Sequence, residues 1–182
     1  MTWDTFHRRG EVLRSVLAHV DAHRDGRLPM ELPGVAETFG DEGSLLAALQ
    51  LRWHTRLGGA VERELAGSPA DLEGAVLTAW RTAARDLAGV RAVLDAAAQN
   101  PADDEIAALV AAARHKEWVL LAAMSGRTSP SSPSAASAGR ELEERARSGY
   151  RPSPPPTPGP GRHASDRDRR SLRDRVRAAL AA

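Results

Sequence analysis

The longest helical pattern of the chain lies in residues 41–67. Apolar side chains there recur every four positions, which on a helix makes one slowly drifting stripe. Further apolar residues widen this stripe in its first half, so the helix needs neighbours on more than one face. We therefore predict the central helix of a bundle, with a kink or a tight helix crossing at Gly58-Gly59. The stripe consists of Leu45, Leu49, Trp53, Leu57, Val61 and Leu65.

Other stretches repeat the helical spacing. Helices are predicted over residues 2–24, from Ser68-Pro69 to about Leu87, over residues 90–97, and from Asn100-Pro101 to a C-terminal stop at Gly126. A short turn of helix is expected at residues 35–39. No run alternates with period two over the length of a strand. The predicted fold class is all-α, a bundle of about four longer helices and one short helix.

The texture of the chain changes after Gly126. We predict a helical bundle domain over residues 1–126 and a disordered Ser/Pro-rich linker over 127–163, with a short helix near 138–148 inside it. Residues 164–182 recover helical spacing and predict a basic amphipathic C-terminal helix. Its apolar face consists of Leu172, Val176 and Leu180.

Charge divides between the two parts. Residues 1–126 carry 13 Lys and Arg against 18 Asp and Glu, a net −5, whereas residues 127–182 carry 12 Arg against 6 acidic residues, a net +6. A basic tail on an acidic body points to an anionic contact, which a protein, a nucleic acid, a membrane or the body itself could supply.

Several classes of function lack their motifs. The chain has no Cys, which excludes disulfides and thiol chemistry, and it has no G-x-S-x-G, no phosphate-binding Gly-rich loop and no paired Glu-x-x-His. We expect no catalytic residue, metal or cofactor, and an enzyme is the less favoured class. The chain shows no signal peptide and no apolar run long enough for a membrane span, so we expect a cytoplasmic protein.

Glu117 is the polar residue that departs most clearly from the pattern, because the spacing of residues 101–126 predicts an apolar side chain there. A buried carboxylate needs a partner, and His54, Arg56 and Arg63 of the central helix are the candidates. One interpretation is a polar site inside the bundle that binds a ligand or transfers a proton. The interpretation favoured by the missing reaction motif is a structural ion pair, or a Glu that reaches solvent.

Arg residues of the tail are the second set of candidates. They suit contact with phosphates or with an acidic partner, although three Asp residues interrupt them. The set comprises Arg167, Arg169, Arg170, Arg173, Arg175 and Arg177.

Residues 1–126, and in particular the segments MTWDTFHRRGEVL and ALQLRWHTRL, resemble an uncharacterised family of small all-helical proteins of high-GC actinobacteria. The resemblance covers the bundle and not the tail. It implies a bacterial cytosolic setting and no activity.

Three hypotheses about function follow. The leading one is a non-enzymatic interaction or regulatory protein whose helical body binds a protein partner while the basic tail tethers or modulates that contact. The alternative is a nucleic-acid-associated protein that binds phosphates through the tail. The third is a ligand-binding or enzymatic bundle centred on Glu117 and His54, which requires a cavity between their helices.

Overall fold

A computed structural model describes residues 3–67, 69–152 and 154, and these residues form helices with no strand among them. The predicted all-α class is confirmed. In chain order the helices are α1 (Trp3–His23), α2 (Val35–Phe39), α3 (Glu42–Ala66), α4 (Leu72–Asp86), α5 (Ala88–Gln99), α6 (Asp104–Met124) and α7 (Ala135–Ser148).

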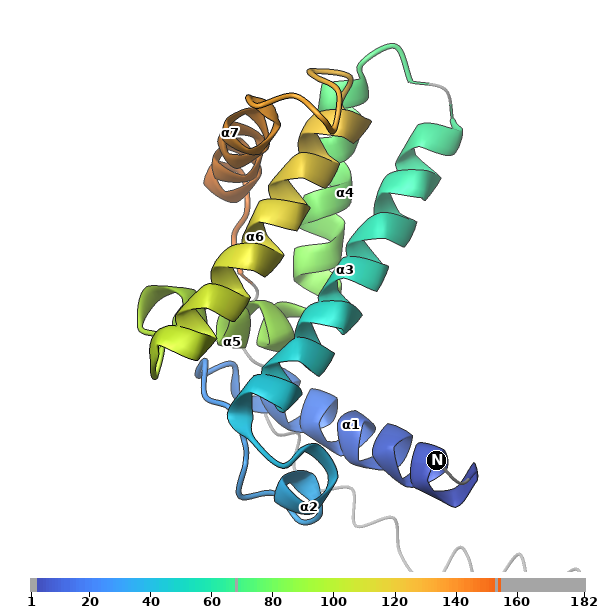
Figure 1. Cartoon of the computed structure of the whole chain (residues 1–182). Helices are drawn as coiled ribbons and strands as arrows, with labels where there is room; N and C mark the ends of the chain where they lie inside the picture. The colour runs from blue at the N-terminus through green and yellow to red at the C-terminus, as the bar shows by residue number, and fades with distance from the viewer. Residues whose placement is uncertain (1–2, 68, 153, 155–182) are drawn as a thin grey trace, which may run out of the picture.

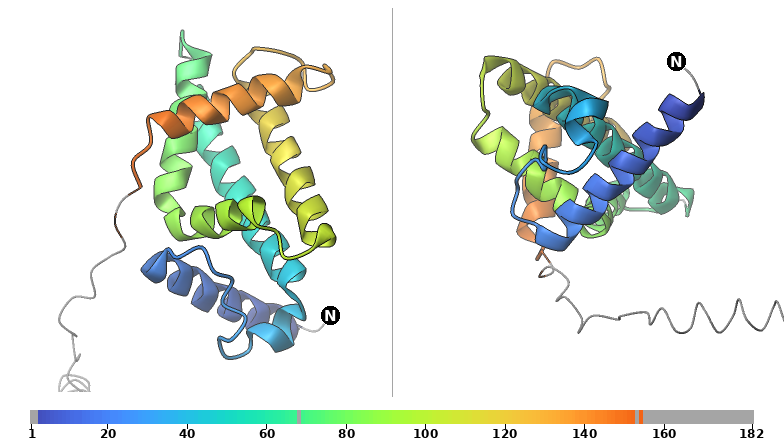
Figure 2. Two further views of the ribbon diagram at one scale, coloured as in Figure 1. Left: turned by 90° about the vertical axis from the view of Figure 1, so that its left-hand side faces the viewer. Right: turned by 90° about the horizontal axis from the view of Figure 1, so that it is seen from below.

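Three long helices, α3, α4 and α6, stand side by side at the centre of the molecule (Figure 1). Helices α3 and α6 run in the same direction, and α4 runs against them (Figure 1). The central position predicted for α3 agrees with its packing, because it contacts α2, α4, α5 and α6. Helix α1 lies across one end of this group and packs on α5, whereas α7 crosses α4 and α6 towards the other end (Figure 2).

Each central helix begins at an Asp that caps it. The carboxylates of Asp41, Asp71 and Asp103 accept hydrogen bonds from the backbone N–H three residues further on, at 2.6, 2.8 and 2.8 Å. The starts predicted at Pro69 and Pro101 are therefore three residues too early, since α4 begins at Leu72 and α6 at Asp104. An Asp side chain satisfies the free N–H groups of a first turn, and this cap decides where each helix begins.

Large apolar side chains from all the central helices form one core. Trp53 and Trp80 are fully buried and meet edge to face, with ring centroids 5.9 Å apart. Trp118, by contrast, is half-buried. Around the two buried rings pack Leu45, Leu46, Leu49, Leu57, Val61, Val76 and Leu121, all at most 1 % exposed.

Close helix crossings occur at glycines other than the predicted pair. A Cβ at Gly58 would have no neighbour within 4 Å, so no crossing forms there and α3 continues through it. Instead, Gly89 of α5 lies against the Val20 carbonyl of α1, and Gly139 of α7 lies against the Trp118 carbonyl of α6. Both positions need glycine because any side chain would overlap a neighbouring backbone.

Helix α6 ends at the predicted position, but the folded body continues beyond it. Gly126 adopts a φ of 72°, and the Arg127 N–H bonds back to the carbonyl of Ala122 at 3.2 Å, which closes the helix end. Beyond it, α7 packs on α6 and α4 and buries Leu142 completely. The body therefore extends past the boundary predicted at Gly126, and the short helix expected near 138–148 belongs to it as α7.

Candidate functional site

The carboxylate of Glu117 lies at the centre of the body with a 1 % exposed side chain. Both of its oxygens are hydrogen-bonded. Oε1 accepts the indole N–H of Trp80 at 3.0 Å, and Oε2 accepts the indole N–H of Trp53 at 2.9 Å. The guanidinium of Arg91, from α5, is 3.4 Å from Oε2 and supplies the opposite charge.

Arg91 extends the contact towards the surface. Its guanidinium is 5 % exposed, faces the ring of Trp53 with 4.9 Å to the centroid, and binds Asp95 one turn along α5. Arg147 of α7 donates to both oxygens of Asp95, at 2.7 and 2.9 Å. The Arg91–Asp95 pair of α5 therefore links Glu117 of α6 to Arg147 of α7.

Helix α7 adds Glu143, whose side chain is 3 % exposed. Its carboxylate accepts the indole N–H of Trp118 at 2.6 Å and two N–H groups of Arg147 at 2.7 and 2.9 Å. Arg114 of α6 lies 3.6 Å away from it. Three carboxylates and three guanidiniums thus form one balanced group, the ionic cluster, made of Arg91, Asp95, Arg114, Glu117, Glu143 and Arg147.

Electrostatics keep the outer acids of the cluster charged. Burial alone would raise the pKa of Asp95, but hydrogen bonds from Arg147 and the charge of Arg91 outweigh it and lower that pKa below its usual value. Burial likewise opposes ionisation of Glu143, whereas the charges of Arg147 and Arg91 lower its pKa. Because every acid faces a cation, the cluster can remain charged inside the protein.

Glu117 is buried, so the alternative in which it reaches solvent is wrong, and its ion pair forms with a partner other than the three candidates. His54 pairs with Gln50 at 3.1 Å, Arg56 binds Asp86 of α4, and Arg63 is exposed. None of the three donates a described hydrogen bond to the Glu117 carboxylate, although its charge acts on His54, and the carboxylate is met by an Arg from α5 instead. Periodicity identified the face of Glu117 but not the helix opposite it.

A sequence signal for the true partner exists. Arg91 and Asp95 are the only charged residues of α5, and they stand four positions apart in an otherwise apolar and Ala-rich helix. Such a spacing places both side chains on one face. In a helix with buried Val90, Val93 and Leu94, that spacing marks an ion pair at the edge of a core.

The surface between α3 and α6 holds the clearest exposed apolar feature. Leu51 is 68 % exposed and lines a groove of about 320 Å³. Small side chains form much of its lining, so a second element can approach closely. This α3–α6 groove is lined by Ala47, Gln50, Leu51, His54, Leu109, Ala112, Ala113 and Lys116.

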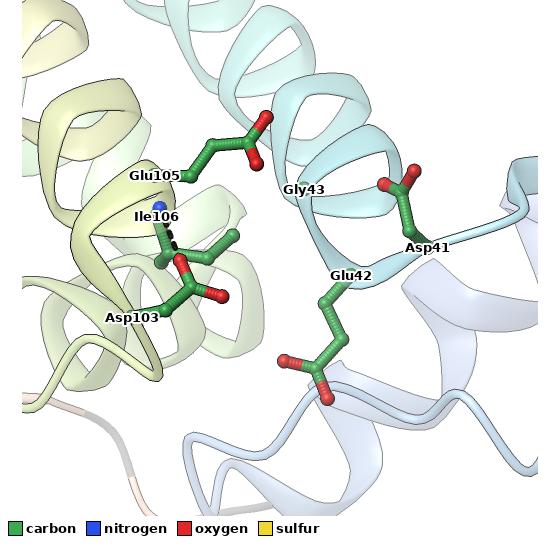
Figure 3. A pocket seen from close by; sticks show the side chains of 6 residues that line it. All are labelled: Asp41, Glu42, Gly43, Asp103, Glu105 and Ile106. Carbon is green, nitrogen blue, oxygen red and sulfur yellow. Dashed lines mark hydrogen bonds between the residues drawn. The ribbon is translucent and has the colours of Figure 1, made fainter.

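Acidic residues gather at the N-terminal end of the same two helices. Figure 3 shows four acidic residues around one pocket, Asp41 and Glu42 at the start of α3 and Asp103 and Glu105 at the start of α6. Two of them are the helix caps described above, and carboxylates suit the positive ends of two parallel helices. We refer to these four residues as the acidic end. Among the described residues, no group of three His, Cys, Asp or Glu side chains is arranged to hold a metal ion.

The six candidate Arg residues of the tail, Arg167 to Arg177, lie outside the described residues. Within the described part of the chain, no helix combines the length and the apolar character that a bilayer crossing demands.

Comparison with known proteins yields no relative. No family model matches the chain, and neither a curated protein nor a solved structure matches it. The resemblance to an actinobacterial family therefore stays a prediction.

Proposed function

We propose that this chain is a non-enzymatic interaction protein whose body receives a helix of a protein partner in the α3–α6 groove. The observation that carries the proposal is Leu51, which is 68 % exposed beside an apolar groove. A helix laid in a groove uses apolar anchors three and four residues apart, and the small side chains Ala47, Ala112 and Ala113 leave room for them.

The ionic cluster supports a non-enzymatic role because the buried carboxylate at its centre has no position free for a substrate. Both oxygens of Glu117 already accept hydrogen bonds, and its neighbour Arg91 is paired with Asp95. A general acid or base needs a free position within reach of a substrate. The cluster is therefore better suited to holding α5, α6 and α7 in register, which gives the groove a rigid wall.

The experiment is a pull-down with the tagged full-length chain that reads both protein and nucleic acid. Removing residues after 126 would delete α7 and open the ionic cluster, so point variants are the sounder comparison. Leu51→Asp places a charge in the groove. Leu72→Asp, on a residue 42 % exposed at the start of α4, is the matched control outside the groove.

We expect a specific protein to be retained by the wild type and by Leu72→Asp and to be lost with Leu51→Asp. A partner that Leu51→Asp retains would remove the groove from the proposal. Recovery of nucleic acid alone, weakening steeply with salt, would favour the alternative in which the Arg residues of the tail bind phosphates.

A further inference from the structure

The α3–α6 groove and the acidic end form one continuous seam. Gly43 lines the acidic end, and the groove begins one turn further on at Ala47 of α3; on α6, Glu105 is followed one turn later by Leu109. The seam therefore offers acidic side chains at one end and apolar contact beyond them. We infer that residues 164–182 of this same chain dock along the seam as a helix, with their apolar face in the groove.

The path of the chain brings the tail to the end of the helix bundle at which the acidic end lies. After α7, the ring of Tyr150 packs on Trp80, and the carbonyl of Pro154 accepts a hydrogen bond from Arg24 at 3.1 Å. Residues 26–28, which follow Asp25, line a hollow that also includes Glu42 and Ile106, and both of these line the acidic end. The last described residue thus lies at the same end of the helix bundle as the acidic end, across the body from it.

The length of the intervening chain is sufficient. Nine residues separate Pro154 from Ala164, and at about 3.1 Å per residue a Pro-rich segment of this length reaches about 28 Å. Helix α6, with 21 residues, is about 31 Å long. The linker can therefore span a distance close to the length of α6, which is the reach that docking on the seam requires of it.

The body and the tail carry opposite net charges, and the apolar spacing of the tail fits the groove. Residues 1–154 carry 18 Lys and Arg against 21 Asp and Glu, a net −3, whereas residues 155–182 carry seven Arg against three Asp, a net +4. Residues 166–170 hold three of these Arg and two of the Asp, a net +1, and their Arg side chains would face the acidic end. Val176 and Leu180, one turn apart, would then reach Leu51 in the groove.

This inference shares its groove with the proposed function, because a docked tail and a partner helix would compete for Leu51. It gives the tail a regulatory role, in which the chain covers its own binding site until a stronger helix displaces the tail. Its test needs no partner, so the two ideas fail separately.

The chain suits a site-specific cross-linking test. Lys116 is its only Lys and lines the groove, and the chain has no Cys. A single Cys introduced at Ala181, near the predicted groove end of the tail, is joined to Lys116 with a short reagent that links a thiol to an amine. The matched control carries the Cys at Ala164, at the acidic end. Peptide mapping separates the Lys116 product from attachment to the N-terminal amine.

We expect the intramolecular Lys116 product to form much more with Ala181→Cys than with Ala164→Cys. Adding Leu51→Asp, or Val176→Asp in the tail, should weaken docking about tenfold because each removes one buried apolar contact. Val176→Asp leaves the folded body unchanged, so its effect cannot come from unfolding.

Equal yields from both Cys positions, or yields that neither Asp substitution lowers, would overturn the inference. A product of twice the chain mass and no intramolecular product would assign the groove to a second copy instead. A Lys116 cross-link, with no protein captured even by Val176→Asp in which the tail is released, would keep the docked tail and refute the proposed function. A captured protein without the Lys116 cross-link would do the reverse.

Discussion

Replacing Glu117 by Gln tests whether the ionic cluster holds the body together. The substitution keeps the shape of the side chain and removes its charge. Whichever way the amide turns, its NH₂ group meets an indole N–H, because Oε1 accepts from Trp80 and Oε2 from Trp53. One buried donor therefore loses its acceptor.

The expected cost follows from these contacts. A buried unpaired donor costs about 1–3 kcal/mol. Breaking a buried ion pair costs about 3–5 kcal/mol, but Arg91 keeps Asp95 as a partner and so retains part of that energy. We expect Glu117→Gln to lower the free energy of unfolding by about 3–5 kcal/mol, a large part of the about 5–15 kcal/mol typical of a domain.

Urea unfolding followed by Trp fluorescence measures this loss, since the buried indoles report directly on the site. Glu144→Gln is the matched control, because Glu144 is 64 % exposed and pairs only with Arg140 on the surface of α7. That exposed pair should contribute about 0–1 kcal/mol. A loss for Glu117→Gln no larger than the loss for Glu144→Gln would refute the reasoning.

Three further predictions concern packing and pH. Gly139→Ala should lower the free energy of unfolding by about 1–3 kcal/mol, because its methyl group overlaps the backbone of α6. Gly58→Ala, in open space, should raise it by about 0.5–1 kcal/mol. Thermal or urea unfolding measures both. Since the folded-state pKa of Asp95 is lowered, its contribution is present above about pH 4 and is lost as the pH falls through the folded pKa, so Asp95→Asn should flatten the acid limb of stability. Burial lowers the pKa of His54, and the charges of Arg91 and Lys116 add to this effect while the charge of Glu117 opposes it. The NMR titration of the His54 ring should therefore have its midpoint below about pH 6.5.

Each of these has a contrary result. Equal effects of Ala at positions 139 and 58 would mean that the close crossing of α7 and α6 does not constrain the fold. An acid limb unchanged by Asp95→Asn would remove Asp95 from the acid response. A titration of His54 at or above the ordinary His value would show that water reaches its ring freely.

The fold class and the burial of Glu117 could be predicted because both depend on local spacing. Which guanidinium faces that carboxylate could not, since Arg91 lies 26 positions away and reaches it only through the packing of α5 on α6. The spacing of two charges on an apolar helix was available as a signal. That spacing indicates a buried ion pair, but it does not indicate which helix packs against the pair.

The folded extent of the chain was harder to predict for a related reason. Helix α7 buries Leu142 together with glycine and alanine, and the rest of its attachment comes from charged side chains. A pattern of apolar residues is therefore nearly absent, and the segment resembles a charged linker helix. Its packing face depends on Gly139, where a missing side chain allows contact between backbones.

The ionic cluster also determines how the body opens. Detaching α7 by itself would leave Arg91 and Trp118 facing a vacated contact, because Glu143 and Arg147 would go with it. Local fraying of α7 is therefore disfavoured, and its amide hydrogens should exchange with solvent only when α5 and α6 unfold as well. Helix α7 therefore unfolds together with α5 and α6, as part of one cooperative unit. The point at which the chain leaves the body stays fixed until that unit unfolds.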